Sequence, residues 1–208
     1  MPEPESVELP MFPLGSVLFP AMPLALRVFE ERYLAMLAEV LQVEPSEFGV
    51  VLIERGQEVG GGEHRFDVGT LASVVELEGA DGFVALLAYG TRRFRVLEWL
   101  ADDPYPRARI TWLDDVEWNE ELAPVRTRVE REVRRALAVG TEFADVPYSA
   151  AVELVDDPVD AAWQLAAIAP LNELDQFRLL CSASLSQLFD ELEPMAEAAA
   201  SQFRGMAN

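Results

Sequence analysis

The pattern of apolar and polar positions changes character within the stretch from Leu9 to Tyr33. Its first part consists of short apolar runs that are interrupted by Pro10, Pro13, Pro20 and Pro23. Each proline fixes φ and lacks a backbone donor, so this part cannot form one continuous central strand or helix. We predict short extended pieces that are joined by rigid corners.

From Phe29 onward the apolar positions follow a helical repeat. The acids Glu30 and Glu31 suit a first helical turn, where the helix dipole favours negative charge. We therefore predict an amphipathic helix from about Phe29. Its apolar side consists of Phe29, Tyr33, Met36, Leu37, Val40 and Leu41.

The chain that follows, up to about Asp115, has the pattern of several short strands. The predicted strands are Phe48–Ile53, Phe66–Leu77, Phe83–Tyr89, Phe94–Leu100 and Arg107–Leu113. Glycine-rich turn signals at Glu78–Gly82 favour a hairpin, and Gly90 indicates a bend or bulge. Short strands with turn signals between them favour a small closed or half-closed barrel over a parallel sheet.

The last ninety residues have helical spacing. One helix is predicted between Leu122 and a C-terminal cap at Gly140, and later helices begin after Asp157, Asn172 and Ser184. Pro194 is expected to kink or divide the last of them. The predicted fold class is α+β, with a β-barrel subdomain over residues 1–117, one inserted helix, and a helical bundle over residues 118–208.

Charge and composition narrow the function. The chain of 208 residues has 37 acidic and 16 basic side chains, for a formal charge of −21, and every base is arginine. Such acidity opposes binding to nucleic acid or to an anionic membrane, because affinity for phosphates rests on basic residues. The single cysteine, Cys181, and the absence of a signal-peptide pattern after Met1 favour the cytoplasm.

Five blocks of sequence carry a family likeness. They are Pro13–Tyr33, Phe48–Ile53, Phe66–Leu77, Asp81–Val96 and Asp156–Leu192. In this order and spacing they resemble the N-terminal substrate-binding domain of the Lon proteases, in a stand-alone form, and more distantly the β-rich domain of cereblon. The resemblance covers nearly the whole chain. It implies a PUA-like pseudo-barrel followed by a helical bundle, and a role in binding protein segments.

The likeness carries over no catalytic residue. The phosphate-binding loop of Lon-type ATPases needs a lysine, and so does the serine–lysine pair of the Lon peptidase. This chain contains no lysine, so we expect neither chemistry, no cofactor and no enzyme activity, although association with the family suggests a peptidase.

The proline-rich loop offers candidate binding residues. A proline-braced loop can hold apolar side chains outward at little entropic cost, which suits capture of unfolded proteins. Phe19 and Met22 are the first candidates for such substrate binding, with Val17 and Leu18 beside them. The competing interpretation places apolar side chains of this loop in the core, and we favour it for Leu24 and Leu26.

The basic cluster Arg92, Arg93 and Arg95 is a second candidate. It could bind an anion or an acidic peptide, or pair internally with Glu30 or Glu31, and we favour internal pairing for Arg93.

Other features favour a structural interpretation. His64 is the only histidine, and the glycine triplet Gly60–Gly62 lacks a lysine, so neither indicates a metal site or a phosphate loop. Two hypotheses remain. The first is a binding module for protein segments or unfolded proteins that serves as adaptor or regulator in proteolysis. The alternative is a small-ligand binder that uses a groove between barrel and bundle. The sequence leaves the oligomeric state open.

Overall fold

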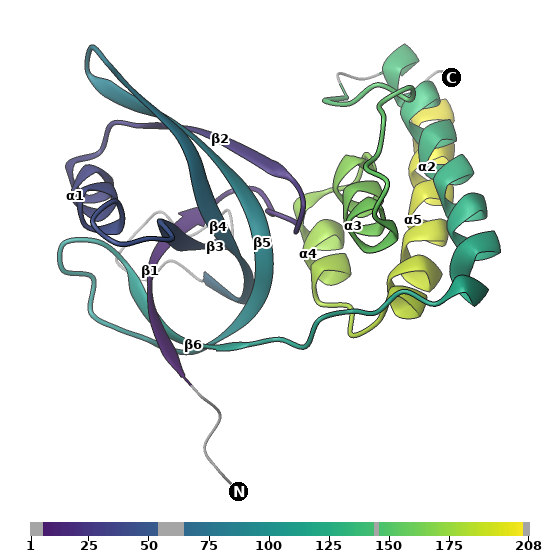
Figure 1. Cartoon of the computed structure of the whole chain (residues 1–208). Helices are drawn as coiled ribbons and strands as arrows, with labels where there is room; N and C mark the ends of the chain where they lie inside the picture. The colour runs from purple at the N-terminus through teal and green to yellow at the C-terminus, as the bar shows by residue number, and fades with distance from the viewer. Residues whose placement is uncertain (1–5, 54–64, 144–145, 206–208) are drawn as a thin grey trace, which may run out of the picture. The chain divides into compact units, whose positions relative to one another are not determined.

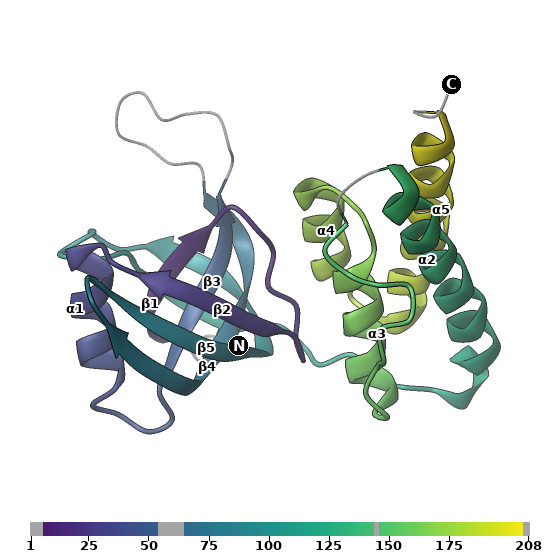
Figure 2. The ribbon, with the colours of Figure 1, turned by 90° about the horizontal axis from the view of Figure 1, so that it is seen from above.

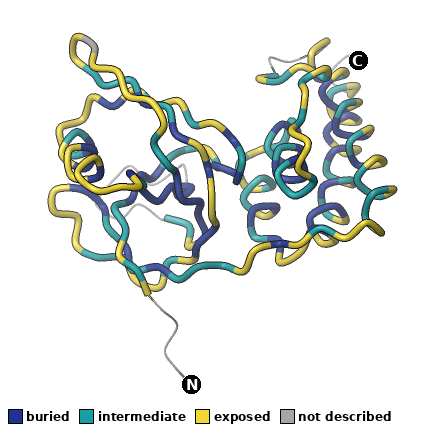
Figure 3. Tube along the Cα trace, in the orientation of Figure 1, coloured by how far each residue is buried: buried dark blue, intermediate teal, exposed yellow. Residues whose placement is uncertain are grey.

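The computed structural model is a mixed α+β structure that describes residues 6–53, 65–143 and 146–205 (Figure 1). It divides into two units, Met1–Asp115 and Val116–Asn208, and each is described by itself. Figure 3 shows buried residues on the strands of the first unit and at intervals along the helices of the second.

The described part of the first unit, residues 6–53 and 65–115, contains six strands and one helix. They are β1 (Val7–Leu14), β2 (Pro23–Val28), α1 (Glu31–Val40), β3 (Glu47–Ile53), β4 (Arg65–Ala80), β5 (Phe83–Trp99) and β6 (Arg107–Trp112). The strand order is β2-β5-β4-β3-β1-β6, and an additional β5–β6 pairing closes a ring of β1, β3, β4, β5 and β6. Strand β2 lies outside this ring and pairs with β5 alone within the described residues.

The long strand β5 makes this arrangement possible. Its first half, Phe83–Tyr89, pairs with β2 and β4, and its second half, from Phe94, pairs with β4 and β6. The two strands predicted on either side of Gly90 are therefore one strand, in which the register against β4 shifts near Gly90. The closed ring encloses a core cluster of Met11, Val51, Phe94, Ala108 and Ile110.

Helix α1 is held on the barrel by stacking and by a polar network. The rings of Phe12 and Tyr33 stack with centroids 4.1 Å apart. The Tyr105 hydroxyl and Arg107 Nη1 both donate to the carboxylate of Glu39, the latter at 3.0 Å. The hydrogen bond from Tyr105, helped by Arg107, lowers the pKa of Glu39. Burial and the bond to Glu39 raise the pKa of Tyr105 to about 12.

The apolar side of α1 differs from the prediction at its ends. Tyr33, Met36, Leu37 and Val40 are buried, but Phe29 and Leu41 are exposed. The helix begins at Glu31 after the cap residue Glu30, so Phe29 precedes it and does not share its apolar face.

The second unit is helical, with α2 (Ala123–Phe143), α3 (Pro158–Ile168), α4 (Glu173–Leu180), α5 (Leu185–Gly205) and a short 3-10 turn η1 (Glu120–Leu122). The long helices α2 and α5 lie side by side (Figures 1 and 2). Asp157 and Asn172 cap α3 and α4 through their side-chain oxygens, as predicted. No described helix is long and apolar enough to cross a membrane.

The structure corrects the predicted helix end at Gly140 and the predicted division of the last helix at Pro194, whereas a kink at Pro194 stays a prediction. Gly140 does not end α2, which continues to Phe143; it is buried within the helix, where a Cβ would lie 2.9 Å from Val146 Cγ1 and 3.1 Å from Phe203 Cε2. Pro194 does not divide α5, which runs through it. Buried residues hold the helix on both sides of the proline, with Leu188 and Leu192 before it and Ala196 and Ala199 after it.

Candidate surface for binding polypeptide segments

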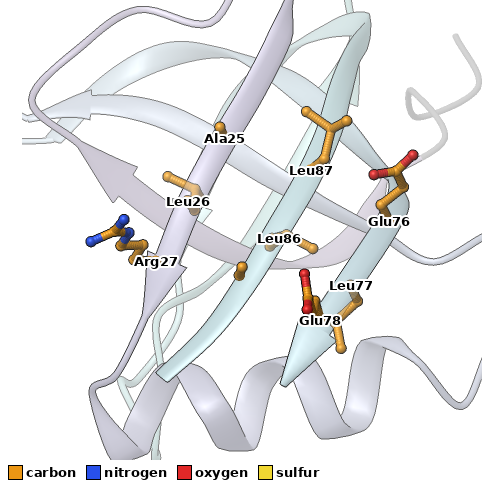
Figure 4. Close-up of a pocket in the computed structure, with 9 residues that line it drawn as sticks. Ala25, Leu26, Arg27, Glu76, Leu77, Glu78, Leu86 and Leu87 are labelled. Carbon is orange, nitrogen blue, oxygen red and sulfur yellow. The ribbon is translucent and has the colours of Figure 1, made fainter. Parts of the chain in front are cut away.

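A groove of about 920 Å³ lies on the three-stranded sheet formed by β2, β5 and β4. Nine residues line it, and they are three consecutive rows across the three strands. The rows are Leu26–Leu86–Leu77, Ala25–Leu87–Glu76 and Arg27–Ala85–Glu78. Figure 4 shows these residues on their three neighbouring strands, with Arg27 on β2 and both glutamates on β4.

The register determines which side chains share a face. Residues that are paired across antiparallel strands project to the same face, and neighbours along a strand project to opposite faces. The row of three leucines therefore points to one face, and the other two rows point to the opposite face. Leu86 is buried, whereas Leu77 is 42% exposed at the β4 end of its row.

The face opposite the leucine row is apolar in its middle and charged at its margins. Ala25, Leu87 and Ala85 form the middle, and Glu76 and Glu78 are exposed on β4. Arg27 is exposed on β2 with its guanidinium 5.3 Å from the centroid of the Phe83 ring. Sheet surface of this kind fits an apolar segment that carries charged flanks.

The proline-rich loop does not present the predicted apolar side chains. Phe19 is only 1% exposed, and Leu18 and Met22 are buried, so the prediction that this loop holds Phe19 and Met22 outward was wrong. Val17 is half-buried. The physical reason is a tight turn in which the Met22 amide donates to the Phe19 carbonyl, with Pro20 and Ala21 at its centre.

This turn is fastened to the sheet at Gly90. The Ala21 amide donates to the Gly90 carbonyl at 2.9 Å, and the Gly90 amide donates to the Met22 carbonyl at 2.9 Å. Two residues thus oppose one, which is a β-bulge at the entry to β2. The Thr70 hydroxyl also donates to the Leu18 carbonyl at 2.6 Å. The loop is part of the barrel's packing and positions β2.

The three arginines of the predicted cluster make separate contacts. Arg93 is 6% exposed and its Nη2 donates to the Asp114 carbonyl at 3.0 Å. Arg92 lies over the Trp112 ring at 4.8 Å, and Arg95 is 3.6 Å from Asp67. Each is engaged by a different group, and Arg92 faces the opposite side of β5 from Arg93 and Arg95. A structural role for Arg93 stays a prediction.

Sequence reasoning missed the groove. It assigned Leu24 and Leu26 to the core, and both are half-buried. The available signal was the alternation of Leu24, Ala25, Leu26 and Arg27, which is typical of a strand with one wet face. The same alternation in Glu76, Leu77 and Glu78 was a second signal.

Other candidate chemistry is weak in the described residues. A hollow on the second unit is lined mainly by ionic side chains, but its Arg134 is engaged by Glu130 at 2.8 Å and by two carbonyls. No group of three His, Cys, Asp or Glu side chains could hold a metal within residues 6–53, 65–143 and 146–205. His64 and Gly60–Gly62 lie outside the described residues. Cys181 is half-buried at the end of α4.

Comparison with known proteins gives this surface its context. Residues 8–194 match the family described as the ATP-dependent protease La (LON) substrate-binding domain. The chain belongs to this family. The match confirms the resemblance that the five sequence blocks indicated.

Curated relatives in the family are much longer proteins. A Lon protease of Anaeromyxobacter dehalogenans is 35% identical over 154 residues, which are 71% of this chain and 18% of that protein. The Lon protease of Escherichia coli K12 is 25% identical over 200 residues, which are 93% of this chain and 25% of that protein. The chain thus spans a quarter or less of these relatives.

Two solved structures have the same fold over nearly their whole length. A Lon N-terminal domain protein from Xanthomonas campestris has a TM-score of 0.65 and 28% identity, with 89% of this chain and 96% of that chain covered. The N-terminal domain of a Lon protease from the Mycobacterium avium complex also has a TM-score of 0.65, with 91% and 98% covered. At 13% identity, the second likeness supports the fold alone.

Proposed function

We propose that the chain is a protein-binding module that recognises apolar segments of unfolded or partner polypeptides, without catalysis, and serves as an adaptor or regulator in proteolysis. The observation that carries the proposal is the groove on β2, β5 and β4. Apolar side chains stay partly open to solvent there in an otherwise strongly acidic chain. Membership of a family described as substrate-binding supports the same function.

The charge of the chain favours one kind of segment. Glu76 and Glu78 border the groove on β4, and the chain as a whole carries −21. A segment with basic residues next to its apolar part is attracted by this field, and an acidic one is repelled. Phosphate backbones are repelled for the same reason, so nucleic acid is an unsuitable partner.

Binding of fluorescein-labelled casein, measured by anisotropy, tests the proposal. Leu77→Ser removes a side chain that is 42% exposed. A bound segment that covers the Leu77 side chain stabilises the complex by about 1 kcal/mol, which corresponds to roughly fivefold in Kd. Leu87→Ser probes the opposite face of the same sheet. We expect one of the two variants to weaken binding about fivefold, and which one identifies the face that is used.

Val75→Ser is the matched control. Val75 lies on the same strand and is 53% exposed, but it does not line the groove, so its loss should leave Kd unchanged. Absence of casein binding by the wild type, or an equal loss in all three variants, would contradict the proposal. Casein incubated with the protein and ATP should remain uncut, and cleavage would contradict the non-catalytic part.

A further inference from the structure

The outer edge of β2 carries a regular set of backbone groups that face away from the sheet. Gly90 N donates to Met22 O, which makes Met22 and Gly90 a hydrogen-bonded pair in the β2–β5 ladder. Such pairs alternate along antiparallel strands. Leu24, Leu26 and Val28 therefore bond inward to β5, and Pro23, Ala25 and Arg27 direct their backbone groups outward.

Within the part of the chain that the structure describes, no strand lies beside these outward groups. Strand β2 pairs with β5 alone in the described residues, and no described residue bonds the amide of Ala25 or Arg27. All three outward residues are exposed. Proline lacks a donor and is tolerated where its nitrogen faces outward from an edge strand, which is where Pro23 lies. Exposed edges with free donors and acceptors are templates for another strand.

We propose that β2 binds an extended partner segment as an additional antiparallel strand, through the amides and carbonyls of Ala25 and Arg27 and the carbonyl of Pro23. The inference rests on the proposed function, because it concerns the conformation in which a polypeptide is held beside the groove. Main-chain bonds supply affinity in this mode, and alternate side chains supply specificity.

The side chains of β2 define the segment that fits. Opposite Arg27, whose charge has no ion-pair partner among the described residues, an acid is complementary. Opposite Leu26, a β-branched apolar residue covers a half-buried side chain. Opposite the small Ala25, a large apolar residue can lean over it toward Leu87, which lines the groove. The expected pattern is acid, β-branched apolar, large apolar.

The acid expected opposite Arg27 differs from the basic flanks that the negative charge of the whole chain favours at longer range. Arg27 lies at the β2 side of the sheet and the glutamates lie on β4, two strands away. A bound polypeptide therefore satisfies both if its acid pairs with Arg27 and its bases lie beyond the paired segment.

A labelled peptide, acetyl-Lys-Ser-Thr-Glu-Val-Phe-Val-Thr-Ser-Lys-amide, whose bases lie beyond the paired segment, tests the pairing by N-methylation. In the antiparallel register with Glu opposite Arg27, the Phe amide faces Ala25 and the preceding Val amide faces away. N-methylation of Phe should weaken binding at least tenfold, and N-methylation of that Val should change Kd less than twofold. Equal losses at the two positions would overturn the strand-addition proposal.

The protein side offers a test variant and a control. Ala25→Pro removes an outward amide and leaves the inward bonds of Leu24 and Leu26 in place, and Val75→Ser changes a residue on β4 that lies outside the groove and away from β2. With thermal unfolding confirming that both are folded, Ala25→Pro should weaken peptide binding at least tenfold and Val75→Ser should bind as the wild type does. An Ala25→Pro protein that is folded and binds normally would overturn the proposal.

Failure of this inference is distinguishable from failure of the proposed function. If wild-type protein binds casein, with Leu77 or Leu87 sensitive, but does not bind the peptide, the groove function stands and strand addition is refuted. If neither casein nor the peptide binds, both are refuted.

Discussion

Replacement of Gly90 by alanine tests whether the proline-rich loop is part of the barrel core. A Cβ at this position would lie 2.2 Å from the Phe19 carbonyl oxygen and 3.0 Å from its carbon. Both obstacles are backbone atoms of a turn that is itself bonded to Gly90, so neither can yield without breaking the attachment. We expect Gly90→Ala to displace the turn from β5.

The magnitude follows from what the displacement breaks. Two backbone hydrogen bonds, from Ala21 and to Met22, are lost, and the fully buried side chain of Phe19 is withdrawn. Net values of about 0.5–1.5 kcal/mol for each bond and about 1.5–3 kcal/mol for the side chain give a loss of about 2.5–6 kcal/mol.

Urea unfolding followed by the fluorescence of Trp99 and Trp112 measures this loss in the first unit, in a background where Trp118 and Trp163 are replaced by phenylalanine. Gly79→Ala is the control, because Gly79 lies on β4 of the same sheet and a Cβ there meets nothing within 4 Å. It should change the free energy of unfolding by no more than about 0.5 kcal/mol. A Gly90→Ala protein within 1 kcal/mol of wild type would refute the reasoning.

Three further predictions concern stability. Ala21 has a φ of 59°, a conformation that favours glycine, so Ala21→Gly should stabilise by about 0.5 kcal/mol, seen as a higher Tm; a lower Tm would contradict this. Arg93→Met removes a hydrogen bond that the largely buried guanidinium donates to the Asp114 carbonyl and should cost about 1–3 kcal/mol in urea unfolding, against less than about 0.5 kcal/mol for the exposed Arg95→Met; equal costs would count against a structural Arg93. Because the pKa of Glu39 is lowered in the folded state, its ionised carboxylate stabilises the fold at pH values above the unfolded-state pKa of about 4.3. This stabilisation is lost as the pH falls through the folded-state pKa. The stability gap between wild type and Tyr105→Phe should therefore be full at neutral pH and shrink in acid; a gap constant from pH 7 to pH 3 would show that Glu39 is not its source.

Features that depend on a few neighbouring residues were predictable from the sequence. Asp157 caps α3 through bonds to the amides of Val159 and Asp160 at 2.9 and 3.0 Å, and this chemistry lies within four consecutive residues. The alternation of polar and apolar residues over Arg107–Trp112 likewise predicts a strand, whichever strands lie beside it. Periodicity and turn signals also indicated a barrel followed by a helical bundle, and the family likeness added the PUA-like type of the barrel.

Features that depend on register between distant segments were not predictable. Phe19 is buried because its turn meets Gly90, about seventy residues later, and nothing local distinguishes it from an outward side chain. The leucine row of the groove joins Leu26, Leu86 and Leu77 only because two ladders align them. A slip of one residue in the β2–β5 ladder would move Leu26 to the other face of the sheet, and a slip in the β4–β5 ladder would move Leu77 there.

The position of β2 outside the closed ring makes binding surface and scaffold separable. The ring of β1, β3, β4, β5 and β6 is complete without β2, so release of this strand breaks one ladder and opens no barrel. Hydrogen exchange should then be faster at the inward amides of Leu24 and Leu26 than at the ring amides of β3, which lies between two ladders. Substitutions along β2 can accordingly alter which polypeptide segment is recognised, while the closed ring of strands that supports β2 stays the same.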